Sequence, residues 1–566
     1  MRPSITKLLV ANRGESARRI FRTARDMGIA TVAVFTEVDR DAPFVADADE
    51  AVALDRLSER GPAAYLDGPA LVEAAGRSGA DAVHPGYGRL PEDPGFAWRC
   101  AEAGLLFVGP SPESIATLGS KLEAKELAAE ADVPVLSAEE VDGYPPGKLE
   151  AAAEVLGWPV AVKASAGSGG RAMRVVRDGD DLVTAVEAVR REATAAFGDG
   201  TVFFEPWLEE ARRIDVQVFA DGTGRGLHLF ERDCTVGRHH QPVIVEAPAP
   251  KLAQSLRERL VTAALAVADA AGYVGAGTVE FLVSGDQFWF VEMNCRLEVS
   301  HPVTEAILGL DLVAMQLAVA EGRPLPVEAR HCSPSGHAIG VRLCIEDPAE
   351  GHRIPAGLLR RFEIDPLPGL RVETGLASGA GIGADDFGLA TITAFAATRT
   401  EAVRRLATAL EGLRVHGPRS NREQLLAALR QAEFGAGTLD AAFLDRHAGA
   451  SAVAGGGAEA MRLHAVAATL ACLIRSPAGS ASFTGPAGEW VEVAYRLDGS
   501  GTVTDVAVDG GPLPGLRIGG VTADAVDLEV DGLRRRVSVA RDADVFDCDS
   551  RLGHTELVLR RVCYEA

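Results

Sequence analysis

The chain has 566 residues, of which 47% are hydrophobic and 24% charged, and its formal net charge is −23. This length favours roughly three to five packing units over one core, while the negative charge without a long basic cluster argues against a nucleic-acid partner. The sequence holds no apolar run of the roughly 20 residues that a membrane span needs, and its first residues carry no secretion signal. We therefore expect a cytoplasmic protein of several domains that binds neither nucleic acid nor membrane.

Residues 1–118 alternate strand-like and helix-like patterns. Apolar runs predict strands over 8–10, 31–35, 82–83 and 106–108, and a helix is expected over 15–27. Such alternation is typical of a doubly wound α/β domain with a parallel sheet.

The rest of the chain divides into a second α/β unit, a third unit and a tail. We expect residues 119–334 to hold a helix over 121–130 and a buried strand over 159–163, and residues 335–448 to hold strands over 336–343 and 390–397 and a helix over 401–413. The small residues of 449–462 predict a linker. The tail, 463–566, predicts a helix over 463–474 followed by a small β-sheet.

A glycine-rich loop follows the strand that ends at Lys163. It contains Gly167, Ser168, Gly169 and Gly170, with Met173 shortly after. Glycine lets backbone N–H groups close over phosphate oxygens, and a lysine offsets phosphate charge. The tip of a flexible hairpin uses similar residues, so the loop alone leaves both interpretations open.

Two glutamates in neighbouring strands favour phosphate binding. Glu280 and Glu292 lie in predicted strands separated by a short turn, and Asn294 follows two residues later. Their oxygens would share one face, as Mg²⁺ held between protein and phosphates requires. Two exposed strand glutamates are the alternative, but both sit among apolar residues.

These motifs, in this order, resemble the biotin carboxylases of the ATP-grasp superfamily over about residues 3 to 445. The resemblance rests on the glycine-rich loop and on the segments ANRGE at 11–15, HPGYG at 84–88, ERDC at 231–234, EAPAP at 246–250 and HPVTE at 301–305. It implies an ATP-grasp fold with a biotin carboxylase C-terminal domain and a mobile lid over about residues 135–208. It also implies ATP and Mg²⁺, or Mn²⁺, as cofactors.

The resemblance assigns residues to the nucleotide and the metal. Those expected to contact ATP are Lys121, Lys163, Gly167, Ser168, Gly169, Gly170, Met173, Glu205, Leu208 and His240. Those expected to hold the metal are Glu280, Glu292 and Asn294.

The carboxylation residues depart from the family. The resemblance implies that Arg296 binds bicarbonate and Arg342 stabilises the biotin enolate. Ser300, however, stands where the family has its general base, and Pro242 stands where it has a bicarbonate-binding lysine. Losing a general base typically costs about 10²–10⁴ in rate. Because strand residues alternate, we expect Glu298 on the same face as Ser300, as a candidate substitute base.

The C-terminal part of the sequence indicates how biotin would be carried and which subunit the chain would bind. The sequence has no lysine after Lys251, so biotin would be carried on a separate protein. Residues 463–566 resemble the domain that docks such α-subunits to a carboxyltransferase β-subunit, and an unrelated β-rich domain is the alternative.

Three functions remain open, and an oligomer is expected in each. The first is ATP-dependent carboxylation of biotin on a separate carrier, as part of an acyl-CoA carboxylase. The second is an ATP-grasp ligase that activates another small carboxylic acid as an acyl phosphate. The third is a catalytically degenerate subunit that serves assembly with the β-subunit.

Overall fold

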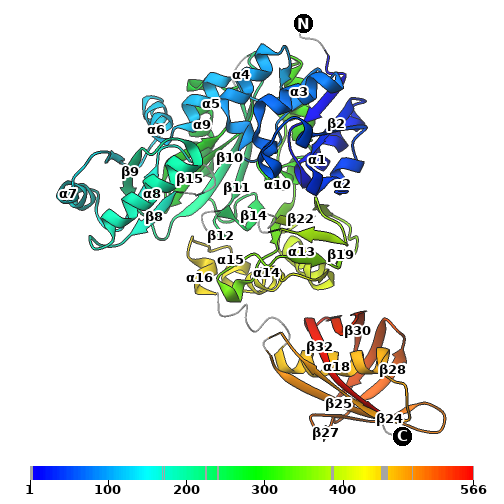
Figure 1. The fold of residues 1–566 in the computed structure, drawn as a ribbon. Helices are drawn as coiled ribbons and strands as arrows, with labels where there is room; N and C mark the ends of the chain where they lie inside the picture. The colour runs from blue at the N-terminus through cyan, green and yellow to red at the C-terminus, as the bar shows by residue number, and fades with distance from the viewer. Residues whose placement is uncertain are drawn as a thin grey trace.

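The computed structural model describes residues 4–167, 170, 172–223, 226–238, 241–383, 388–447, 457–486 and 488–564. The N-terminal domain, blue in Figure 1, holds a five-stranded parallel sheet with the order β3-β2-β1-β4-β5. This confirms the predicted doubly wound domain. Its elements are β1 Lys7–Val10, α1 Gly14–Asp26, β2 Ala30–Phe35, α2 Pro43–Ala46, β3 Glu50–Ala53, α3 Gly68–Ser78, β4 Ala82–His84, α4 Pro94–Glu102, β5 Leu106–Phe107 and α5 Pro112–Gly119.

An eight-stranded sheet joins the second and third units. Its order is β16-β15-β10-β11-β14-β17-β22-β20, and each pair of neighbours is antiparallel. The strands are β10 Arg212–Ala220, β11 Leu227–Asp233, β14 Ile244–Ala247, β15 Gly275–Ser284, β16 Gln287–Asn294, β17 His337–Cys344, β20 Leu370–Glu373 and β22 Gly388–Ala396. Because β17, β20 and β22 come from the third unit, one framework positions side chains from both units.

Helices and small strands complete these two units. The second unit contains the helices α6 Lys121–Glu130, α9 Gln254–Ala270, α10 His301–Leu308 and α11 Leu312–Ala320, with the short α12 Val327–Arg330 after them. The third unit adds β18 Gly357–Leu359, β19 Arg361–Glu363, β21 Ala380–Ile382, α13 Arg399–Gly412, β23 Arg414–His416, α14 Arg422–Leu429, α15 Ala432–Ala436 and α16 Phe443–Arg446. Its core forms where α13 and α14 pack against β17 and β22.

The segment expected to be a lid forms a separate four-stranded sheet with the order β6-β9-β7-β8. It stands to one side in Figure 1 and has its own hydrophobic cluster. Its elements are β6 Glu139–Glu140, α7 Pro146–Leu156, β7 Val160–Ala164, β8 Met173–Val176, α8 Leu182–Phe197 and β9 Val202–Pro206. Its movement stays a prediction.

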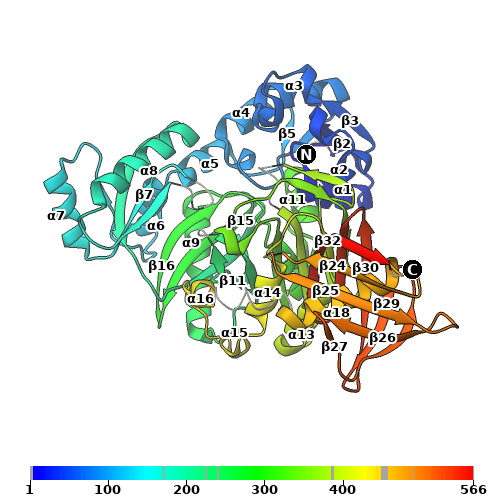
Figure 2. The ribbon, with the colours of Figure 1, turned by 60° about the horizontal axis from the view of Figure 1, so that its bottom comes forward.

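The tail is a nine-stranded antiparallel sheet packed around one helix, α18 Gly457–Cys472, as Figures 1 and 2 show. The strands are β24 Ala478–Thr484, β25 Trp490–Leu497, β26 Val503–Val508, β27 Gly511–Pro512, β28 Arg517–Val521, β29 Ala525–Val530, β30 Leu533–Asp542, β31 Val545–Ser550 and β32 Gly553–Tyr564.

The linker prediction was wrong at its C-terminal end. Residues 457–462 belong to α18, because Ala460 and Met461 are buried against the sheet and their neighbours are good helix formers. Linker residues 449–456 lie outside the described residues.

Within the described part of the chain, no single helix has the length and apolar character to cross a membrane. Helices α10 and α11 pass that test only as a pair, across a bend of 97°.

Candidate active site

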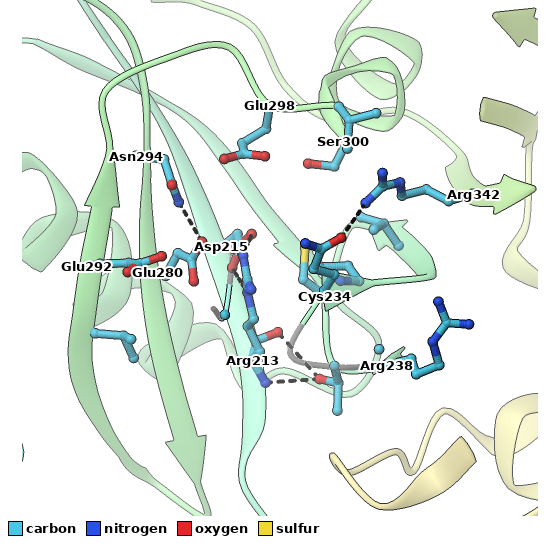
Figure 3. Close-up of a pocket in the computed structure, with 18 of the residues that line it drawn as sticks. Arg213, Asp215, Cys234, Arg238, Glu280, Glu292, Asn294, Glu298, Ser300 and Arg342 are labelled. Atoms are coloured by element: carbon cyan, nitrogen blue, oxygen red, sulfur yellow. Dashed lines mark hydrogen bonds and ion pairs between the residues drawn. The ribbon is translucent and has the colours of Figure 1, made fainter. Parts of the chain in front are cut away.

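A cavity of about 910 Å³ opens where the N-terminal domain, the lid and the long sheet meet. This size suits a nucleotide with a second small substrate. Tyr87 lines it from the N-terminal domain, Lys163 and Met173 from the lid, and Arg342 and Thr391 from β17 and β22. Figure 3 shows its interior, with Glu280 and Glu292 on one side and Ser300 and Arg342 on the other.

The predicted metal residues come together on the β15–β16 hairpin. Glu280 lies directly opposite Glu292, and Asn294 is opposite Thr278. Asn294 Nδ2 donates a hydrogen bond to Glu280 Oε1 at 2.5 Å. Antiparallel pairing thus places two carboxylates and one amide oxygen on one wall of the cavity, and oxygen ligands are what Mg²⁺ prefers.

The neighbouring strand adds a charge pair that the sequence analysis missed. Arg213 on β10 forms ion pairs with Glu280 and, at 2.9 Å, with Asp215. Asp215 itself lies opposite Glu280 in the β10–β15 ladder. The alternation of Arg213 and Asp215 along a strand was the available signal, but it did not reveal which strand lies beside β15.

The two carboxylates predicted to hold the metal differ in acidity. Burial raises the pKa of Glu280 well above its usual value, Arg213 opposes this, and Asp215 and Glu292 add repulsion. Burial also acts on Glu292, but Lys121 and Arg213 outweigh it and lower its pKa. A cation placed between them would relieve their repulsion.

Lysines occupy the nucleotide side of the cavity. Lys121 Nζ lies 3.1 Å from Glu292 Oε2 and donates to the carbonyl oxygen of Gly167. Lys163 forms an ion pair with the buried Glu205, which also pairs with Lys125 at 2.9 Å. Burial would raise the pKa of Glu205, but the two lysines bring it down to about 2.

Most other predicted nucleotide residues line the same cavity. Gly170, Met173 and Leu208 are on its wall together with Lys121 and Lys163. The Glu205 side chain does not line the cavity and instead pairs with Lys163 and with Lys125 behind the wall. Ser168, Gly169 and His240 lie outside the described residues.

Arg296 stands between two carboxylates. It forms ion pairs with Glu298 and, through Nε at 2.9 Å, with Glu92, and its Nη2 donates to Asn294 Oδ1 at 3.1 Å. Burial lowers the pKa of Arg296, but Glu298 and Glu92 raise it above its usual value. The guanidinium is therefore charged and already partly neutralised by the protein.

The predicted strand does not continue to Ser300, which corrects the sequence analysis. Strand β16 ends at Asn294. The backbone N–H of His301 donates to the carbonyl oxygen of Glu298 at 3.0 Å, and this hydrogen bond closes a turn before α10. Arg296, Glu298 and Ser300 nevertheless all line the cavity. The predicted common orientation of Glu298 and Ser300 is therefore correct, but it results from the turn before α10 and not from strand alternation.

The replaced family positions also line the cavity. Ser300 is buried and immediately precedes α10. Pro242 lies in a hairpin of β12 Gly237–Arg238 and β13 Gln241–Pro242. Arg342 Nη1 donates to Gln241 Oε1 at 3.3 Å, an interaction drawn in Figure 3. On this side the structure thus places a hydroxyl and a proline ring beside an arginine.

Three family models match successive parts of the chain. They are the biotin carboxylase N-terminal domain over residues 4–115, the ATP-binding domain of the carbamoyl-phosphate synthase L chain over 120–328, and the biotin carboxylase C-terminal domain over 340–446. Biotin carboxylase 2 of Bacillus subtilis is 43% identical over 451 residues, which cover 78% of this chain and 99% of that protein. The chain belongs to the biotin carboxylase family.

Solved biotin carboxylases share the fold. A Campylobacter jejuni biotin carboxylase, in a complex described as β-γ-ATP, has a TM-score of 0.74 at 35% identity, covering 78% of this chain and 99% of that one. The biotin carboxylase domain of Hydrogenobacter thermophilus 2-oxoglutarate carboxylase, a dimer with MgADP, ADP and bicarbonate, has a TM-score of 0.75 at 34% identity, covering 79% and 98%.

Longer relatives extend beyond the match. The α subunit of mitochondrial methylcrotonoyl-CoA carboxylase from Arabidopsis thaliana is 41% identical over 447 residues, which cover 78% of this chain. The chain spans about three fifths of the length of such α subunits, 61% in that case. The matched family segments end at residue 446, before α18.

Proposed function

We propose that this chain is the biotin carboxylase-type subunit of an acyl-CoA carboxylase, using ATP and Mg²⁺ to phosphorylate bicarbonate and passing the carboxyl group to biotin on a separate carrier. One observation carries the proposal: a single cavity joins the lysines, the opposed carboxylates and the two arginines that these steps require. The relatives solved with MgADP and bicarbonate support it.

The residues present fit a magnesium nucleotide. Glu280, Glu292 and Asn294 offer oxygen ligands, and Lys121 and Lys163 offer positive charge on the same wall. Bound Mg²⁺ would neutralise phosphate charge during transfer. Because Lys121 contacts Glu292 directly, a cation at Glu292 would leave the lysine to face phosphate.

The arginines and Glu298 would handle bicarbonate. Arg296 would hold the anion through a charge-assisted hydrogen bond, and Glu298, already in contact with Arg296, would take its proton. This replaces the base that Ser300 cannot supply. Arg342, on the opposite wall, would face the carboxyl acceptor.

A second function is favoured by the altered half of the cavity. Glu298 and Glu92 both pair with Arg296, while Pro242 and Ser300 supply neither a cation nor a base. A larger carboxylic acid could be held by Arg342 and use the space beside Ser300. The chain would then be an ATP-grasp ligase that forms a different acyl phosphate.

An ADP-release assay separates the two functions. We would measure ADP formation by the full chain with bicarbonate and free biotin, and separately with a panel of small carboxylic acids. Glu292→Gln is the control for ADP formed by contaminating enzymes. Release that depends on bicarbonate supports carboxylation, and release that appears only with another acid supports the ligase.

A restored variant sharpens this result. The double substitution Pro242→Lys and Ser300→Glu returns the lysine and the base, so it should raise bicarbonate-dependent release by about 10²-fold if these groups are what limits the wild type. If the restored variant gains this activity and the wild type has none with any acid, catalysis by the native chain is excluded and the assembly function remains.

The tail supports a role in assembly. We propose that residues 463–566 dock the chain to a carboxyltransferase-type β-subunit within an oligomer. The support is the architecture, a β-sheet around one helix, which lies beyond the matched family segments. Size-exclusion chromatography with the purified β-subunit of the same host tests this, with a chain that ends at residue 447 as the control. Equal co-elution of both chains would contradict docking through the tail.

A further inference from the structure

Two histidines and an aspartate meet where the tail contacts the third unit. Among the residues that the structure describes, one group of three His, Cys, Asp or Glu side chains has its ligand atoms within 4.8 Å of one another: His416, Asp549 and His554. His416 ends β23, whereas Asp549 and His554 lie opposite each other on β31 and β32. We propose that these three side chains bind a divalent metal ion of the zinc class and thereby join the tail to the third unit.

The distances are close to those of a metal site. His416 Nε2 lies 2.7 Å from Asp549 Oδ2, and His554 Nδ1 lies 3.0 Å from Asp549 Oδ1. Zinc binds nitrogen and oxygen at about 2.0–2.2 Å, so tetrahedral ligand atoms lie about 3.3 Å apart. The two nitrogen–oxygen pairs would therefore open by about 0.3–0.6 Å to admit the ion, and the two ring nitrogens lie within 4.8 Å of each other.

The pattern of donors calls for added positive charge. Both ring nitrogens of each histidine face a carboxylate: the other nitrogens, His416 Nδ1 and His554 Nε2, lie 3.8 and 3.5 Å from Asp547. A neutral imidazole has one N–H, and an ionised carboxylate only accepts. With one N–H on each ring, two nitrogen lone pairs would be directed at carboxylates, and an added positive charge, either a proton on each ring or a bound cation, resolves this. A cation at Asp549 removes this conflict, because both lone pairs can then bind the metal.

Asp547 occupies the outer position that such sites use. A histidine that binds a metal commonly directs its other N–H to a carboxylate, which fixes the ring orientation. Asp547 faces the outer nitrogens of both rings and is itself held by Arg360 through contacts of 2.9 and 3.2 Å. The rings stack with centroids 5.4 Å apart and an interplanar angle of 19°, so one carboxylate can serve both.

The charge around the cluster also favours a divalent ion. Asp547 and Glu556 pair with one guanidinium, Arg360, while Asp549 pairs with the two histidines and has Arg361 nearby. The carboxylates outnumber the arginines, which favours a bound cation. Mixed nitrogen and oxygen ligands suit zinc, whereas Mg²⁺ and Ca²⁺ prefer oxygen alone.

Strand geometry explains why the site forms at this contact. Residues alternate between faces, so Asp547 and Asp549 point out of β31 toward the third unit while Cys548 points into the tail core. His416 pairs with Arg361 across the β19–β23 ladder, next to Arg360. The metal would therefore set the orientation of the tail relative to the cavity-bearing domains.

Metal binding by the full chain tests the proposal. We would strip the protein with chelator, keep excess Mg²⁺ present to occupy the Glu280–Glu292 pair, and titrate Zn²⁺ against a chromophoric competitor. One Zn²⁺ per chain is expected, and Asp549→Asn and His554→Gln should each weaken binding by about 100-fold or more. Co²⁺ in place of Zn²⁺ should show visible d–d absorption that Asp549→Asn abolishes.

A matched control lies in the third unit. His447 pairs with Glu433 at 2.9 Å, and its side chain is 26% exposed, close to the 23% of His554. His447→Gln should bind Zn²⁺ like the wild type. A wild-type chain that binds less than about one tenth of an equivalent of Zn²⁺, or a His447→Gln variant weakened as much as His554→Gln, overturns the proposal. The wild-type stoichiometry needs no variant to fold, and neither readout depends on ADP release.

Discussion

The two halves of the cavity differ in how their charges are matched. In the nucleotide half, Lys121 faces Glu292 and Arg213 faces Glu280, so each metal carboxylate has a cationic neighbour. In the acid half, Arg296 faces both Glu92 and Glu298. One half thus holds oppositely charged pairs, and the other holds a cation shared between two anions.

This difference coincides with where the sequence predicts departures from the family. The residues proposed to hold ATP and Mg²⁺ include the opposed carboxylates of one hairpin. The predicted departures, Ser300 and Pro242, line the other half together with Arg342. Under the proposed function, this half would determine which carboxylate is activated.

The largest effect should come from Glu292→Gln. Removing this carboxylate takes away a metal ligand and the partner of Lys121, so ADP release should fall by about 10³-fold. Steady-state ADP formation measures it, and Glu258→Gln, an exposed position on α9, is the control. An active Glu292→Gln enzyme would mean that the metal is held elsewhere.

Glu298→Gln tests whether the acid half contains a base. If Glu298 accepts the substrate proton, kcat should fall by about 10²-fold. Glu92→Gln is the matched control, since Glu92 contacts the same arginine but does not line the cavity, and this variant should leave kcat within about 3-fold. If both variants instead lower KM for the acid without loss of kcat, the two carboxylates only compete with substrate for Arg296.

Glu15→Gln tests a pH effect at the contact between the N-terminal and third units. Thr391 on β22 donates to Glu15 at 3.1 Å, and burial raises the pKa of Glu15 to about 7 although Arg342 opposes it. The folded chain thus holds this proton more tightly than the unfolded chain. The stability from this group is complete below about pH 4.5 and is lost as the pH rises through about 7.

The substitution should remove that pH dependence. Relative to the wild type, Glu15→Gln should raise the free energy of unfolding by about 3 kcal/mol near pH 8 and change it little near pH 4. Urea unfolding at both pH values measures the difference. Equal effects at the two values would show that folding does not shift the pKa of Glu15.

Ser300→Ala should have the smallest effect. A serine hydroxyl is no base near neutral pH, so its removal should change kcat by less than about 3-fold. The same ADP-release assay checks this. A loss of about 10²-fold would show that the hydroxyl contacts the reacting acid and would favour the ligase that uses another carboxylic acid.

Local pattern was sufficient for much of the fold and for the pairing of Glu280 with Glu292. The strand and helix periods identify β1, β2 and α6, and the short turn between two apolar strands predicts the hairpin that brings Glu280 opposite Glu292. The prediction from strand alternation was wrong beyond Asn294, because the strand ends there and a turn closed by His301 follows. The linker prediction was also wrong at Gly457, because small residues alone do not distinguish a linker from a buried helix face.

The sequence by itself determined the family and the α/β architecture and predicted the residues for ATP and a metal, because these depend on short segments in which chemistry and periodicity coincide. Only the tertiary structure decided which charges share a partner. Glu92 reaches Arg296 from another domain, and Asp549 reaches His416 from the tail. The strength of an ion pair depends on distance and burial, and for residues far apart in the chain packing alone sets both.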